Sequence, residues 1–299
     1  MFVLSLMLLV PGADDPSDTL AKKMLPVYVK EASDYTFAIE TAAKVKKELE
    51  FKKEPIFEWS NTTREGLQQG VVFLWLRDGR PAAIGSIFSQ PHEKPAGRQI
   101  MHEFHALDTE KLIVTRPKET LNEWKPKAGL ERKELSDAAA PAATPGARLI
   151  QMKKLAAEFT GYETDQDKKR WELRLLPAPL YRYPTAKNGI IDGALFTLVS
   201  TAGTDPEVLL LIEAREVEGK ARWEYACGRF SDRNLFVQRN DKDVWSMVRG
   251  DTNTFNNDAQ HLYSLYADKV VNLDGKLLAR VRVTEKVPWG EVVPVEEKP

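Results

Sequence analysis

The chain of 299 residues carries 43 basic and 44 acidic side chains, and 42% of its residues are hydrophobic. This composition is typical of a globular protein with sizeable buried cores and excludes a disordered chain. No stripe of Lys and Arg interleaved with aromatic residues occurs, so we expect no nucleic-acid partner.

An apolar run from Phe2 to Val10 opens the chain. It is shorter than the roughly 20 residues that span a bilayer, but it suits the apolar middle of a signal peptide, and Pro11 to Ala13 resemble a cleavage region. No Lys or Arg precedes the run, so a frayed or core-docked N-terminal strand is the alternative. We predict a signal peptide and leader over residues 1–20, export to the periplasm, cell envelope or medium, and no later transmembrane segment.

The next segments predict antiparallel strands. Tyr35, Phe37 and Ile39 alternate as in a strand, although "ETAAKVKKELE" also fits a helix. "VVFLWL" and "PAAIGSIF" predict a hairpin, because the intervening Asp78-Gly79 pair tolerates positive φ at both turn positions. Their near-continuous apolar character predicts strands covered on both faces. "ALFTLV" and "EVLLLIEA" predict a second strand pair, joined by a longer loop.

A linker and a helix separate the two halves. Residues 137–147, "DAAAPAATPGA", show no apolar periodicity and predict a linker. Leu149, Met152, Ala156 and Phe159 recur at helical spacing. Thr144 and Pro145 are a suitable start for this helix and Gly161 a suitable end.

The two halves resemble each other. "KELEFKKEPIFEW" aligns with "WELRLLPAPLYRY", "GVVFLWL" with "GALFTLV", "RPAAIGSIF" with "DPEVLLLIE", "HEF" with "WEY" and "LIVTR" with "LFVQR", in order and at offsets of 121 to 125 residues. An internal duplication is our interpretation. The alternative is that two β-rich halves merely share strand composition.

These patterns together predict a mainly β (α+β) protein of two tandem antiparallel β-meander units from an internal duplication, with one bridging helix. The expected boundaries are 28–136 for the first unit, 137–147 for the linker and 148–250 for the helix and second unit. Residues 251–299 are expected to form a loop, a hairpin that turns at Asp274-Gly275, and a tail.

The pattern around His102, Glu103 and His105 is the candidate catalytic site. Two histidines three apart share a helix face, but "RQIMHEFHAL" is expected to be a strand, on which they point to opposite faces. The spacing also differs from H-E-x-x-H, and the aligned residues are Trp223 and Ala226. We therefore predict packed histidines and no metal, and keep these three residues only as weak catalytic candidates.

A second candidate set consists of Arg174, Tyr181, Arg182 and Tyr183, because Arg and Tyr together suit anionic or sugar ligands. A cross-strand tyrosine pair beside a solvated Arg182 is the alternative. Cys227 is the sole cysteine, so we expect no internal disulfide. It lies in the alternating apolar segment "RWEYACGRF" and is therefore predicted to be a buried apolar residue. Nucleotide-binding, hydrolase and C-x-x-C signatures do not occur, and no cofactor is expected.

The stretches "WSNTTREGLQQGVVFLWLRDGRPAAIGSIF", "HEFHAL", "RLIQMKKLAAEF", "WELRLLPAPLYRY" and "DGALFTLVSTAGTDPEVLLLIEAR" carry one resemblance. From about Tyr35 to Trp245 the chain resembles a group of uncharacterised exported proteins of planctomycete-type bacteria. The resemblance implies an envelope or secreted location and supplies no activity, so no functional residue can be transferred.

The function expected from the sequence is that of an extracytoplasmic, non-catalytic binding or scaffold protein, whose partner is an envelope polysaccharide or protein. A hydrolase with its site around His102, Glu103 and His105 is the alternative. A lipid or peptide carrier is a third, and it would need a large apolar cavity inside one unit.

Overall fold

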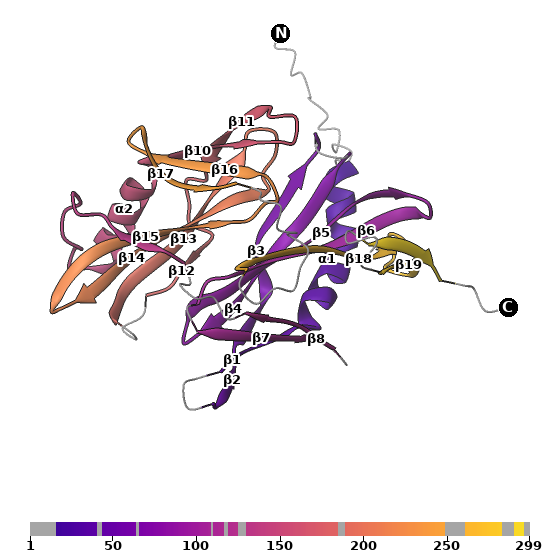
Figure 1. Cartoon of the computed structure of the whole chain (residues 1–299), viewed down its shortest axis with the longest axis horizontal. Coiled ribbons are helices and arrows are strands. Elements are labelled where there is room, and N and C mark those ends of the chain that lie inside the picture. The colour runs from indigo at the N-terminus through magenta and orange to yellow at the C-terminus, as the bar shows by residue number, and fades with distance from the viewer. Residues whose placement is uncertain are drawn as a thin grey trace, which may run out of the picture.

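The computed structural model describes residues 16–40, 44–63, 66–108, 110–116, 119–124, 130–184, 189–248, 261–282 and 290–295. Its sheets are antiparallel and strands dominate its elements, so the predicted mainly β class is confirmed. The predicted leader run and the loop at 251–260 lie outside the described residues. Figure 1 shows the earlier and later halves of the chain lying side by side.

The first unit encloses a core between a helix and two sheets. Met24, Tyr28 and Ala32 lie four residues apart on the helix and are all buried in this core. The helix contacts three strands of the larger sheet, β3, β4 and β5. The elements are α1 (Pro16–Ser33), β1 (Thr36–Glu40), β2 (Lys46–Glu48), β3 (Glu50–Asn61), β4 (Gln68–Arg77), β5 (Arg80–Glu93), β6 (Ala96–Ala106), β7 (Lys111–Arg116) and β8 (Glu119–Trp124).

The second unit repeats this plan with one continuous sheet, which wraps around a helix capped by Thr144. The elements are β9 (Arg132–Glu134), α2 (Pro145–Ala156), β10 (Phe159–Thr164), β11 (Arg170–Leu175), β12 (Tyr181–Arg182), β13 (Ile190–Ser200), β14 (Pro206–Val217), β15 (Lys220–Arg229), β16 (Asn234–Arg239) and β17 (Lys242–Met247).

The strands pair in the same order in both units. β1 pairs with β2 and β7, as β10 pairs with β11 and β16, and the runs β4-β5-β6 and β13-β14-β15 are both meanders. The stretches aligned in the sequence therefore lie on strands with corresponding partners. Connectivity does not test whether the sequence was copied, so the internal duplication stays a prediction.

The two large sheets pack face to face through a shared core. On β4, Phe73 and Trp75 face the core under α1, whereas Val72 and Leu74 face the second unit. The strands β13 and β14 divide their side chains in the same way between α2 and the shared core. This arrangement explains the continuous apolar runs, because both faces of these central strands are covered.

Three late strands complete the sheet of the first unit. β18 (Tyr263–Val271) pairs with β6, and β19 (Leu277–Arg282) and β20 (Glu291–Pro294) follow it outward. In Figure 1, β18 and β19 lie beside the first unit although they follow the second in the chain. The predicted hairpin at Asp274-Gly275 is present, but the predicted tail contains β20.

Two helix predictions need correction. The helix α1 begins at Pro16, within the predicted leader, and makes a second helix besides the bridging one. Its apolar positions are four apart but Pro26 interrupts the run, which weakens the sequence signal. The helix α2 begins as predicted but ends at Ala156, before Gly161. Phe159 continues the helical spacing by chance, because it enters the same core from β10.

A buried charge cluster joins the units at their interface. Glu213 on β14 accepts hydrogen bonds from Arg80 Nε of the first unit at 2.9 Å and from the Tyr183 hydroxyl at 3.0 Å. Arg132 and Arg215 contact its other oxygen, at 3.3 and 3.1 Å. Burial would raise the pKa of Glu213, but the arginines lower it to about 2.

Candidate functional site

A pocket of about 740 Å³ lies between the sheet of the first unit and loops of the second. Alternate residues of a strand share a face, so its floor is built from side chains two apart on neighbouring strands. The apolar part of the floor consists of Trp59, Phe88, Met101, Leu265 and Ala267. The wall consists of residues 164–168, 205–206 and 230–234.

A row of glutamine amides crosses this floor. Gln68 Nε2 donates to Gln90 Oε1 at 2.9 Å, and Gln90 Nε2 donates to Gln99 Oε1 at 3.1 Å. The three side chains come from β4, β5 and β6 and are side by side because these strands pair in register. An amide both donates and accepts, so the row offers fixed polar contacts beside an apolar surface.

The pocket carries more acid than base. Its lining includes the carboxylates of Glu103, Asp165, Asp167, Asp205 and Asp232, against the cations of Lys168 and Arg233. Glu103 is held on the floor by the Tyr263 hydroxyl, which donates to Oε1 at 2.6 Å. Burial and Glu103 raise the pKa of Tyr263, so the phenol keeps the proton that it donates. The excess of carboxylates disfavours a polyanionic ligand.

The three predicted catalytic residues do not converge. His102 faces the core under α1, whereas Glu103 lines the pocket and His105 packs against Gly228 of the second unit. Burial lowers the pKa of His102 to about 3 and that of His105 to about 4, so both rings are neutral at physiological pH. The prediction that His102 and His105 point to opposite faces of the strand is therefore correct. The three side chains do not form the single site that the hydrolase interpretation requires.

The second predicted set does not line this pocket. Tyr181 and Tyr183 stack with ring centroids 6.3 Å apart, and Arg182 binds the buried Asp192 at 2.7 Å. Arg174 is exposed and donates to the carbonyl of Gly203 at 3.4 Å. Tyr183 is buried against Glu213, which gives it a structural role at the interface.

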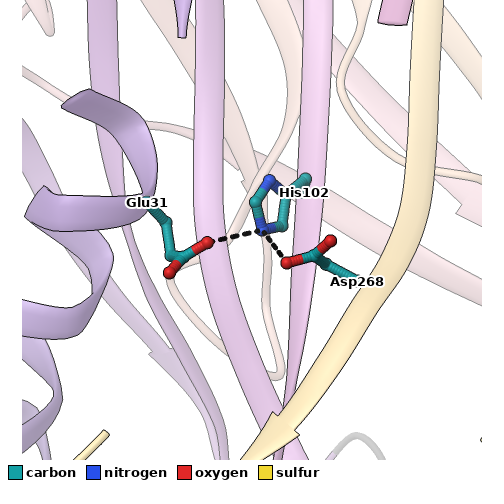
Figure 2. A group of neighbouring side chains, drawn as sticks. All are labelled: Glu31, His102 and Asp268. Atoms are coloured by element: carbon teal, nitrogen blue, oxygen red, sulfur yellow. Dashed lines mark ion pairs between the residues drawn. The ribbon is translucent and has the colours of Figure 1, made fainter. Parts of the chain in front are cut away.

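A cluster of charged side chains, partly buried, lies beside α1 around the fully buried His102. His102 Nε2 lies 3.8 Å from Glu31 Oε2 on α1 and 3.8 Å from Asp268 Oδ2 on β18, as Figure 2 shows. Arg116 bonds to both carboxylates, and Lys269 Nζ bonds to Glu31 Oε1 at 2.6 Å. His102 Nδ1 bonds to the hydroxyl of Tyr35.

Sequence reasoning missed the glutamine row and the partners of His102. The glutamines are scattered in the chain, and only the strand register brings them together. Glu31 and Asp268 come from a helix and a strand at opposite ends of the sequence, and neither lies in a local motif. Cys227, by contrast, is buried as predicted, and burial raises the pKa of its thiol to about 12.

The described part of the chain contains no helix long and apolar enough to cross a bilayer. Comparison with known proteins gives no match to a family model, to a curated protein or to a solved structure.

Proposed function

We propose that this chain is an exported, non-catalytic binding protein whose pocket between the units holds a segment of a neutral polysaccharide. One observation carries the proposal: the row of amides beside an apolar floor on a broad sheet face. A sugar ring has an apolar C–H face and a rim of hydroxyl groups, and such a surface complements both.

The charge of the pocket supports a neutral ligand over an acidic one. Five carboxylates and two cations line it, so an acidic polymer would meet net repulsion. Carboxylates also accept hydrogen bonds from hydroxyl groups. An envelope protein that presents basic side chains is the remaining partner class, and absence of binding to every oligosaccharide in the test below would favour it.

The sequence adds two further supports. The apolar run at Phe2 to Val10 fits export, which would place the protein beside envelope polysaccharides. We also infer that the second unit is a diverged copy of the first. The ordered sequence matches at offsets of 121 to 125 residues support this inference, and the strand pairing is compatible with it. In this view the pocket formed where the two copies pack together, so residues of both units line it.

The test is calorimetric titration of full-length protein with neutral oligosaccharides of glucose, xylose and mannose, and with an acidic oligosaccharide. The Gln90→Ala substitution removes both hydrogen bonds of the amide row, so we expect about ten-fold weaker binding of the preferred glycan. Gln238→Ala is the matched control, because Gln238 is also partly buried but bonds to Asp243 on a strand outside the pocket. Equal affinities for the two variants, or preference for the acidic glycan, would overturn the proposal.

The hydrolase alternative is tested in the same samples, because Glu103 shares the pocket with other carboxylates. Paired carboxylates are the usual catalytic groups of glycoside hydrolysis. Chromatography of the glycan after incubation shows whether it is cleaved. Cleavage that disappears in Glu103→Gln would favour the hydrolase, whereas an intact glycan that still binds supports the binding function.

A further inference from the structure

We propose that Glu31, His102 and Asp268 form a binding site for one divalent transition-metal ion of the zinc type, inside the first unit and separate from the pocket. The three potential ligand atoms lie within 4.8 Å of one another. They come from α1, β6 and β18, and Figure 2 shows the imidazole between the two carboxylates.

The unpartnered nitrogen of His102 is the observation that points to a ligand. His102 is fully buried, and its Nε2 makes no hydrogen bond although it is aimed between two carboxylates at 3.8 Å. A buried polar atom without a partner is costly. Tetrahedral zinc with bonds of about 2.1 Å places its ligand atoms about 3.4 Å apart. The two distances of 3.8 Å from His102 therefore need to close by about 0.4 Å, and the two carboxylate oxygens, within 4.8 Å of each other, by up to about 1.4 Å.

The other imidazole nitrogen is held as metal-bound histidines usually are. His102 Nδ1 bonds to the hydroxyl of Tyr35, which also bonds to the hydroxyl of Tyr266. Such an outer contact orients the ring, and when Nδ1 donates its proton to the hydroxyl, the lone pair of Nε2 is left to bind a metal. One imidazole nitrogen and two carboxylates favour zinc, cobalt or nickel over calcium or magnesium, which prefer oxygen alone.

Two cations already contact the carboxylates, and they set the expected strength of the site. Arg116 and Lys269 bond to Glu31 and Asp268, which orients the carboxylates but balances their charge. A metal ion adds positive charge to this balanced cluster, so we expect weaker affinity than at an all-cysteine structural zinc site. The side chain of Asp268 is 22% exposed, which gives an ion and its fourth ligand a route from solvent.

In the second unit the corresponding arginine contact occurs without a histidine beside it. There Arg239, aligned with Arg116, binds Glu158 and Asp137 and ties the end of the helix segment to the sheet. Trp223 fills the place aligned with His102. The arginine contact thus recurs where no histidine is present, so anchoring the helix does not explain the imidazole.

The experiment uses untagged, full-length protein stripped with a chelator and dialysed against Zn²⁺, with bound metal measured by atomic emission. We expect one Zn²⁺ per chain, a rise in Tm, and visible absorption bands of a low-symmetry site when Co²⁺ replaces Zn²⁺. His102→Leu and the nearly isosteric Asp268→Asn should each weaken binding at least about ten-fold. His92→Leu is the control, because His92 lies on β5 and bonds to the carbonyl of Pro95 outside the cluster.

Circular dichroism of each variant shows whether it is folded. If His102→Leu unfolds, folded Asp268→Asn still decides the question, because its side chain keeps its size and loses its charge. Absence of bound Zn²⁺ in the wild-type protein would overturn the proposal. Binding that survives His102→Leu or Asp268→Asn but disappears in His92→Leu would also overturn it, because the ion would then be held at the surface.

Discussion

At the scale of single residues, Gly193 shows how closely the interface is packed. A Cβ atom at this position would meet the ring of Tyr183 at 2.3 Å. The ring cannot easily move away, because its hydroxyl donates to the buried Glu213 and its side chain is fully enclosed. The absence of a side chain at Gly193 is therefore what allows Tyr183 to reach the charge cluster.

We expect Gly193→Ala to destabilise the protein by about 1–3 kcal/mol, because the added methyl group displaces Tyr183 from Glu213. Urea denaturation followed by tryptophan fluorescence measures this loss. The control is Gly146→Ala in α2, where an added Cβ meets nothing within 4 Å and alanine favours the helix. If the two variants are equally stable, the ring has more room than the structure shows.

The residues of β6 show what the sequence could predict at this scale. Alternation correctly placed His102 and His105 on opposite faces of the strand, since side-chain direction in a strand follows from position alone. The partners of His102 could not be predicted in this way. Glu31 reaches it from α1, which packs across the sheet that contains β6, and Asp268 reaches it from β18, which pairs with β6.

At the scale of elements, the tight hairpins differ in how well their residues suit the turn. Asp78 and Gly79 have positive φ, as do Glu218 and Gly219 between β14 and β15. Both are two-residue turns in which the first position favours Asn or Asp. Glu218 is therefore placed in a backbone conformation that its side chain disfavours.

We expect Glu218→Asn to stabilise the protein by about 0.5 kcal/mol, because asparagine adopts the left-handed conformation more readily. The same substitution at the exposed Glu216, in the preceding strand, is the control and should give no gain. Midpoints of urea unfolding compare the two. A gain at Glu216 as large as that at Glu218 would contradict the turn argument.

The elements were predictable where the local signal was strong. Asp78-Gly79 marked its hairpin, and Thr144-Pro145 marked the start of α2. The turn at Glu218 was not foreseen, because tertiary packing of β14 and β15 imposes it on an unfavourable residue. The helix α1 was missed because most of its stability comes from burial of Met24 and Tyr28 against the sheet.

At the scale of the whole molecule, the Glu213 cluster ties the stability of both units to pH. The pKa of this carboxyl is about 2 in the folded protein, against 4.5 as its ordinary value. A lowered pKa stabilises the fold at pH values above the ordinary one, and this contribution is lost as pH falls from about 4.5 towards 2. The interface should therefore weaken in acid.

We expect Glu213→Gln to destabilise the protein by about 3–5 kcal/mol at neutral pH, because three arginines lose their buried partner. The variant should also lose part of the acid dependence between pH 4.5 and 2. Unfolding by urea across this pH range measures both effects. Glu172→Gln removes only an exposed pair with Arg170 and should change little. An unchanged acid profile in Glu213→Gln would contradict the assignment.

The arrangement of the units could not be predicted from the sequence. The continuous apolar strands indicated that both faces of the sheets were covered, but they did not indicate which elements cover each face. Arg80 and Glu213, which join the units, are 133 residues apart, and no local pattern relates them. The pocket follows from this packing, so its glutamine row could not be assembled from the sequence alone.

Because β18 pairs with β6, the first unit can complete its sheet only after the second unit has been synthesised. Residues 96–106 leave the ribosome early, yet the strand that covers their edge is among the last to be made. Until then an unpaired edge strand remains available to other chains. A premature stop before β18 would thus leave the earlier half incomplete and prone to aggregate, while the strands of the later half would already be present.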